Sequence, residues 1–173
     1  LTLFLQVMDD GRLRDGVGRT VDFTNAVLIA TSNAGTSYIQ EATSRGEPLE
    51  QIKTALLERE LKGIFRPEFL NRFDASIVFA PLTMDDMEQI AWLMLNSLAK
   101  RLEEQGIGFR AEDEAVAVLA KAGFDPLFGA RPLRRVLQDK IENQVADLLL
   151  KKAVARRDTI VLQGDGTLDV EKG

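Results

Sequence analysis

The segment Ala26-Val27-Leu28-Ile29-Ala30-Thr31 is a short, continuous apolar run between the polar residues Asn25 and Ser32. A short run without alternation is typical of a strand that is buried on both faces, as in a parallel sheet covered by helices. A second short run, Ile77-Val78-Phe79, has the same character. We therefore predict an α/β fold in which both segments are strands of a buried sheet.

A hairpin and helices surround these predicted strands. Residues 1–8 are apolar from the outset and have no capping residue before them, which indicates the end of a helix that begins earlier in a longer protein. Alternation on both sides of a Gly-rich turn predicts a β-hairpin over 11–23. Apolar residues at helical spacing after Pro48 predict a helix over 48–63. Residues 1–80 are therefore predicted to be a piece of an α/β sheet domain.

The pattern changes at the boundary Ala80-Pro81-Leu82. Beyond it we predict three amphipathic helices and then two closing strands joined by a Gly-rich turn, over residues 83–105, 112–123, 132–152, 159–162 and 168–170. Residues 81–173 are therefore predicted to form a small helical domain with a terminal β-pair.

The composition excludes several classes of chemistry. The 173 residues contain no Cys and no His, so there is no disulfide framework, no thiol or imidazole catalyst and no metal site made by those side chains. No apolar run approaches the ~20 residues of a membrane helix, so no membrane partner is expected. The 22 Lys and Arg against 27 Asp and Glu give a net charge of −5, which argues against nucleic acid as a partner. A basic stretch at 131–135 leaves nucleic-acid binding as an alternative.

Four polar residues stand where they could meet a phosphate. Asn33 follows the first predicted strand, where ligands of α/β sheets bind, although it could instead cap the next helix. Arg66 and Arg72 flank a Pro-led turn, from which a guanidinium could reach a phosphoryl group on a neighbour or form a salt bridge within the chain. Arg131 precedes Pro132 at the start of a helix, where the helix dipole favours anions, or it belongs to a solvated basic turn.

The order and spacing of these strings resemble one protein family. Phe65-Arg66-Pro67-Glu68-Phe69-Leu70-Asn71-Arg72 and Gly129-Ala130-Arg131-Pro132-Leu133-Arg134-Arg135 are highly specific together, and Thr31-Ser32-Asn33 precedes them. With the hairpin strings at 9–13 and 18–23, the resemblance covers nearly the whole chain. The chain resembles the rear part of the second ATPase module of the Clp/heat-shock protein unfoldases, which are members of the AAA+ superfamily.

The resemblance implies a partial AAA+ parallel-sheet domain over 1–80 and a complete helical lid over 81–173. It implies that Asn33 is the sensor-1 residue, that Arg72 is the arginine finger and that Arg131 is the sensor-2 residue, while Arg66 is a weaker candidate at the same intersubunit interface. The implied function is that of an ATP-dependent chaperone of the stress response, which unfolds proteins or dissolves aggregates. The implied setting is a hexameric ring in the cytoplasm, with ATP and magnesium as cofactors, unfolded or aggregated proteins as substrates and a co-chaperone as an optional partner.

The chain departs from the family pattern in two respects. It has no Gly-x-x-x-x-Gly-Lys-Ser/Thr loop and no strand ending in an acidic pair, which the family carries upstream. We therefore expect that this chain alone neither binds ATP tightly nor hydrolyses it. Residues 36–64 also lack the apolar tripeptide ending in Gly-Phe by which some members dock on a protease, which favours a ClpB-type disaggregase. A protease-coupled unfoldase subunit and a non-catalytic oligomerisation or partner-binding module are the alternatives.

Overall fold

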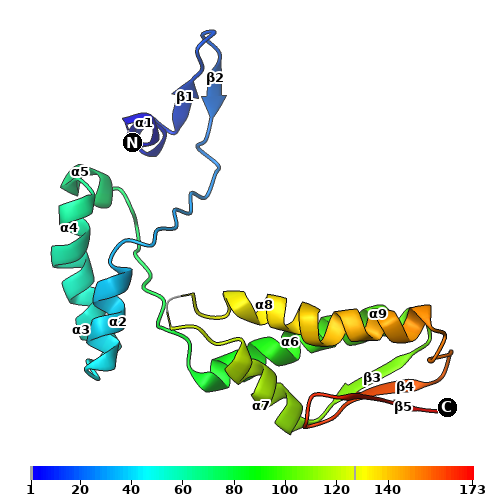
Figure 1. Cartoon of the computed structure of the whole chain (residues 1–173). Coiled ribbons are helices and arrows are strands. Elements are labelled where there is room, and N and C mark those ends of the chain that lie inside the picture. Colours follow the sequence, from blue (N-terminus) through cyan, green and yellow to red (C-terminus); the bar gives the residue numbers. More distant parts are fainter. Residues whose placement is uncertain (1, 127) are drawn as a thin grey trace. The chain divides into compact units, whose positions relative to one another are not determined.

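The computed structural model describes residues 2–126 and 128–173, and it divides the chain into two compact units (Figure 1). Unit 1 ends at Pro81, and unit 2 spans Leu82–Gly173. Among the described residues, no helix is both long enough and apolar enough to cross a membrane.

Unit 1 opens with a helix and a hairpin, which are α1 (Thr2–Asp10), β1 (Arg12–Arg14) and β2 (Thr20–Asp22). The strands are antiparallel, and the Asp15 carboxylate orders their turn by accepting the backbone N–H groups of Val17 at 3.0 Å and Arg19 at 2.8 Å. The hairpin predicted over 11–23 is therefore confirmed. The helix predicted over 1–8 is also present, although Leu1 itself lies outside the described residues.

The rest of the regular structure in unit 1 is helical, with α2 (Thr36–Ser44), α3 (Leu49–Ala55), the π-helical η1 (Leu56–Glu60), α4 (Leu61–Ile64) and α5 (Pro67–Leu70). The run from α3 to α4 is continuous and confirms the helix predicted over 48–63. Buried Ile52 and Leu56 face α2, whose Ala42 is also buried. Gly35 precedes α2 with a φ of 75°, and a Cβ there would lie 2.1 Å from Leu56 Cδ1, so only glycine fits.

The two strands predicted at 26–31 and 77–79 do not form, and those predictions are wrong for this structure. Neither segment is part of a strand, and in Figure 1 the chain between β2 and α2 runs as an extended trace. Their apolar side chains are exposed, at 88% for Val27 and 83% for Phe79. A strand buried on both faces needs neighbouring strands and covering helices, which the described residues of unit 1 do not supply. The mixed helix-and-sheet fold class stands, but its parallel sheet is absent from unit 1.

Unit 2 contains α6 (Met84–Glu103), β3 (Gly108–Ala111), α7 (Asp113–Ala122), α8 (Arg131–Leu137), the π-helical η2 (Gln138–Glu142), α9 (Asn143–Leu150), β4 (Thr159–Leu162) and β5 (Leu168–Glu171). The three predicted helices and the terminal β-pair are confirmed. Strand β3 was not predicted from the sequence. It pairs parallel with β4 and completes a three-stranded sheet in the order β3-β4-β5.

The π-helical turn keeps one face of the last long helix in the core. Leu133, Leu137, Ile141 and Val145 are all buried and follow one another at intervals of four residues. In a straight α-helix a strict four-residue interval drifts by about 40° at each step, because a turn holds 3.6 residues. The wider turn at η2 offsets that drift, so the four side chains stay together in the core.

A capping box fixes the start of α6. The Thr83 hydroxyl accepts the N–H of Asp86 at 3.2 Å, and the Asp86 carboxylate accepts the N–H of Thr83 at 2.8 Å. The hydrogen bonds from the Thr83 backbone and side chain lower the pKa of Asp86. The α6 stripe that begins with Met87 then packs into the core of unit 2.

Candidate functional site

Asn33 lies in an exposed loop immediately before α2. Its carbonyl accepts hydrogen bonds from the Thr36 N–H at 3.3 Å and the Thr36 hydroxyl at 2.6 Å, which hold the loop in a turn. The N-cap position of α2 is Gly35, and no side chain caps that helix end. The alternative that the Asn33 side chain caps the helix is therefore not what the structure shows. Within the described residues, the Asn33 amide group has no hydrogen-bond partner and is accessible.

Arg72 follows α5 and pairs with an acidic residue at the end of α1. Its Nη1 atom lies 2.6 Å from Oδ1 of Asp9, and the side chains are 50% and 35% exposed. The alternative that Arg72 forms a salt bridge within the chain is thus realised in this structure. Because both partners remain in contact with water, this pair contributes little to stability and can be exchanged for another anion.

Three phenylalanines stiffen the turn that carries Arg66 and Arg72. The Phe65 and Phe69 rings lie 5.8 Å apart, and Phe69 meets Phe73 edge to face at 5.1 Å. Arg66 is the exposed N-cap residue of α5, and Pro67 occupies the first helical position. The structure therefore brings the two arginines to either end of one short turn. In the described part of unit 1, no hydrogen bond joins either of them to Asn33.

Arg131 is the first residue of α8 in unit 2 and is exposed. A tight loop precedes it, in which Asp125 and Gly129 exchange backbone hydrogen bonds of 3.1 and 2.7 Å. The Arg131 N–H donates to the Phe128 carbonyl at 3.3 Å. No ion pair reaches the Arg131 guanidinium from the residues that the structure describes, so its charge is available to a ligand.

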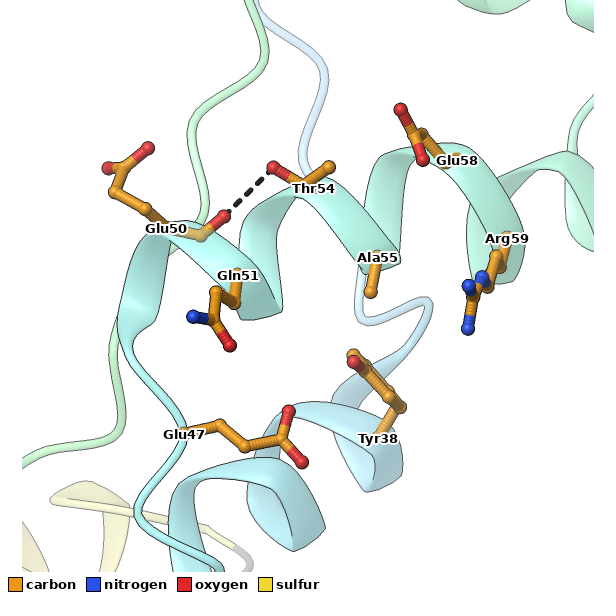
Figure 2. Close-up of a pocket in the computed structure, with 8 residues that line it drawn as sticks. All are labelled: Tyr38, Glu47, Glu50, Gln51, Thr54, Ala55, Glu58 and Arg59. Carbon is orange, nitrogen blue, oxygen red and sulfur yellow. Dashed lines mark hydrogen bonds between the residues drawn. The ribbon is translucent and has the colours of Figure 1, made fainter.

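An open pocket in unit 1 contains none of these residues. It has a volume of about 500 Å³ and lies between α2 and the α3–η1 helix, lined by Tyr38, Glu47, Glu50, Gln51, Thr54, Ala55, Glu58 and Arg59 (Figure 2). Its glutamates outnumber its arginine, so it does not suit a phosphate. Glu47 already pairs with Arg45 at 2.8 Å, and the Thr54 hydroxyl donates to the Glu50 carbonyl at 2.9 Å. In the described ranges, no cluster of acidic side chains could hold a metal ion.

The sequence analysis missed one cationic feature, which lies between α9 and β4. Lys151, Lys152, Arg156 and Arg157 fall within seven residues there and are all exposed. The only sequence signal was this local excess of positive charge in an acidic chain.

Comparisons with known proteins divide the chain at the same place as the two units. Residues 1–76 match the family described as AAA domain (Cdc48 subfamily), and residues 82–162 match the C-terminal, D2-small domain of ClpB protein. Together the two matches assign the chain to part of an AAA ATPase domain and to the small domain that follows it.

Full-length relatives make the assignment more specific. A chaperone protein ClpB from Rhodopirellula baltica is 43% identical over 171 residues, which cover 99% of this chain and 19% of the relative. The ClpB of Vibrio vulnificus strain YJ016 is 49% identical over 152 residues, covering 88% of this chain and 18% of the relative. A Staphylococcus aureus ATP-dependent Clp protease ATP-binding subunit ClpC is 42% identical over 171 residues, covering 95% and 21%. The chain spans about a fifth of the length of these curated relatives, and it belongs to the ClpB/ClpC family, in which it corresponds to the C-terminal part of the second AAA module.

Proposed function

We propose that this chain supplies the sensor residues and the arginine finger of an ATP-dependent protein unfoldase or disaggregase that works as a hexameric ring. The substrates are unfolded or aggregated proteins, and ATP and magnesium are bound by elements that this sequence does not contain. The observation that carries the proposal is the Phe65–Arg72 string, whose second arginine stands half exposed on a turn stiffened by contacts between aromatic rings. The proposed setting is the cytoplasm.

In this proposal Arg72 stabilises the charge that develops during phosphoryl transfer on a neighbouring subunit. A guanidinium stays charged at all relevant pH values and matches the geometry of phosphate oxygens. The exposed pair with Asp9 holds Arg72 in a defined place between turnovers. A triphosphate carries more charge than one carboxylate, so it competes successfully for the same guanidinium.

Asn33 and Arg131 act in the proposal as sensors on separate units. The free amide of Asn33 positions the attacking water, while the unpaired guanidinium of Arg131 contacts the γ-phosphate. Because ATP and ADP differ in that phosphate, Arg131 binds the two nucleotides with different strength. This difference in free energy is what couples hydrolysis to a movement of unit 2. Arg66 is proposed as a supporting contact at the subunit interface.

This chain alone is expected not to bind ATP, because its sequence contains no Gly-x-x-x-x-Gly-Lys-Ser/Thr loop to hold the phosphates. Isothermal titration of the chain with ATP and magnesium should give only the heat of dilution. Arg131→Ala is the matched variant and should behave in the same way. Saturable binding in the micromolar range would show that the chain holds a nucleotide site of its own.

The proposed function is tested by a chimera in which this chain replaces the matching segment of the Vibrio vulnificus ClpB. The chimera should form hexamers, hydrolyse ATP and reactivate a heat-aggregated test enzyme. Assembly without hydrolysis would favour the non-catalytic oligomerisation module instead.

A protease-coupled unfoldase is the second candidate, favoured by the 42% identity to a subunit named for the Clp protease. Residues 36–64 contain no apolar tripeptide ending in Gly-Phe, which favours the disaggregase over this second candidate. The chimera should therefore fail to stimulate a barrel protease.

A further inference from the structure

The segment 150–158, which we call the basic loop, connects α9 to β4 at one end of unit 2 (Figure 1). It contains Lys151, Lys152, Arg156 and Arg157 and one acidic residue, Asp158, so its net charge is 4 − 1 = +3. Unit 2 has 13 basic and 16 acidic residues, which leaves 9 − 15 = −6 outside the loop. The basic loop is therefore a concentrated patch of positive charge on an acidic unit.

Most of this charge has no ion-pair partner in the part of the chain that the structure describes. Among the described residues, Lys151 alone of the four cations forms an ion pair, at 3.5 Å from Asp147, and both side chains are largely exposed. Asp158 does not neutralise the nearby cations of the loop, because its buried carboxylate is already engaged. It accepts hydrogen bonds from the Lys172 ammonium at 2.8 Å and from the Ala155 N–H at 2.8 Å. Lys152, Arg156 and Arg157 are therefore available to an outside partner.

Two of these cations occupy backbone positions that favour glycine. Lys152 has a φ of 52° and Arg157 a φ of 77°, and they are the non-glycine residues with positive φ in the described part of the chain. The loop does not need their side chains for its shape, because backbone N–H groups make the bonds: Lys152 donates to Leu149 at 3.1 Å, and Arg157 donates to Gly106 at 2.8 Å. Glycine would make the same bonds with less strain. Lysine and arginine at these two positions therefore add positive charge at a cost in backbone strain.

The loop also offers a fixed apolar surface beside the charges. Leu150 is 81% exposed, whereas Val154 is anchored in the core. The Arg156 side chain lies across Gly106, at the rim of a hollow of about 470 Å³ that includes the half-buried Phe109. The loop therefore presents its cations beside the exposed Leu150 side chain, while Val154 fixes the loop to the core of unit 2.

We propose that the basic loop is a docking site for an acidic polypeptide segment that also carries aliphatic side chains. Carboxylates of such a segment would pair with Lys152, Arg156 and Arg157, and an aliphatic side chain would cover Leu150. A nucleic acid fits less well, because the loop has no aromatic side chain for base stacking. A long polyanion would also extend past the basic loop and run along the rest of unit 2, which is negatively charged. Phosphates that come within roughly 8 Å of those negative charges would be repelled, because salt does not screen charges at such short range.

The test is fluorescence polarisation of the full chain with a labelled twelve-residue peptide of alternating Glu and Leu. We expect saturable binding that weakens with salt and disappears when Gln replaces Glu in the peptide. Lys152→Gly/Arg157→Gly should lower the affinity about tenfold, as expected for the loss of two ion pairs. The same variant should raise the melting temperature, because it relieves backbone strain. A purely structural role for these side chains would not produce that combination.

Lys121→Ala/Lys140→Ala is the matched control, since it removes the same charge from exposed positions elsewhere in unit 2. Its affinity should stay within about twofold of the parent chain, because those residues lie outside the basic loop. The proposal is overturned if the control weakens binding as much as the loop variant does. It is also overturned if the loop variant binds normally, or if single-stranded DNA of equal charge binds more tightly than the peptide. None of these outcomes depends on ATP, so they do not bear on the proposed ATPase role.

Discussion

Arg72→Ala in the Vibrio vulnificus ClpB chimera is expected to lower the kcat for ATP hydrolysis by roughly 10³–10⁵ while nucleotide affinity changes little. An arginine supplied from a neighbouring subunit acts on the charge of the transition state more than on the bound ground state. Steady-state ATPase assays and titration with a labelled nucleotide measure the two quantities separately. Sedimentation must show that the variant still assembles, because the finger acts only within a ring.

The pair with Asp9 allows the catalytic and the structural role of Arg72 to be separated. Asp9→Asn removes the negative charge from the 2.6 Å pair but leaves the guanidinium in place, so ATP hydrolysis should be largely retained. Arg72→Lys keeps the charge but loses the planar fork, and it should recover only part of the rate. Arg59→Ala removes an exposed arginine of η1 as the matched control and should be active. If Asp9→Asn lowers kcat as much as Arg72→Ala does, then the salt bridge matters and the finger assignment is wrong.

The helices of unit 2 were predictable because their information is local. Apolar residues at helical spacing marked α6, and Thr83 with Asp86 formed the box that starts it. Strand β3 was missed for the opposite reason. It pairs with β4, which lies about fifty residues later in the sequence, so no local pattern marks it as a strand.

The failed strands in unit 1 show where local pattern is insufficient. The run at 26–31 has the composition of a buried strand, but burial requires partners that composition does not provide. The exposed Val27 and Ile29 are the direct sign that those partners are missing from the described residues.

The candidate site was predictable as a set of residues but not as an arrangement. The strings singled out Arg66, Arg72 and Arg131, and the structure finds all three exposed. No sequence pattern pointed to Asp9 as the partner of Arg72, because the contact joins two distant turns. The positive φ angles at Lys152 and Arg157 were likewise not predictable, since they accompany backbone hydrogen bonds to Leu149 and Gly106 that the folded loop makes.

Gly123→Ala is expected to destabilise unit 2 by about 3 kcal/mol, which corresponds to a fall in melting temperature of roughly 12–20 °C. Gly123 ends α7 and is buried beneath the start of α8. A Cβ there would lie 2.5 Å from the Cα atom of Leu133, which is itself fully buried. The single tryptophan, Trp92, is packed against the core of unit 2, so its fluorescence during heating reports on this unit.

The clash at Gly123 is with backbone, and this determines how the prediction can fail. Leu133→Ala in the same chain should not rescue Gly123→Ala, because trimming the side chain leaves the Cα atom where it was. Gly63→Ala in α4 of unit 1 is the control, and its melting is followed by circular dichroism because Trp92 reports on unit 2. A Cβ there meets no atom within 4 Å, and alanine favours the helix by about 0.5–1 kcal/mol. If Gly123→Ala melts within a few degrees of the parent chain, or if Leu133→Ala restores its stability, then α8 does not pack its backbone against this glycine.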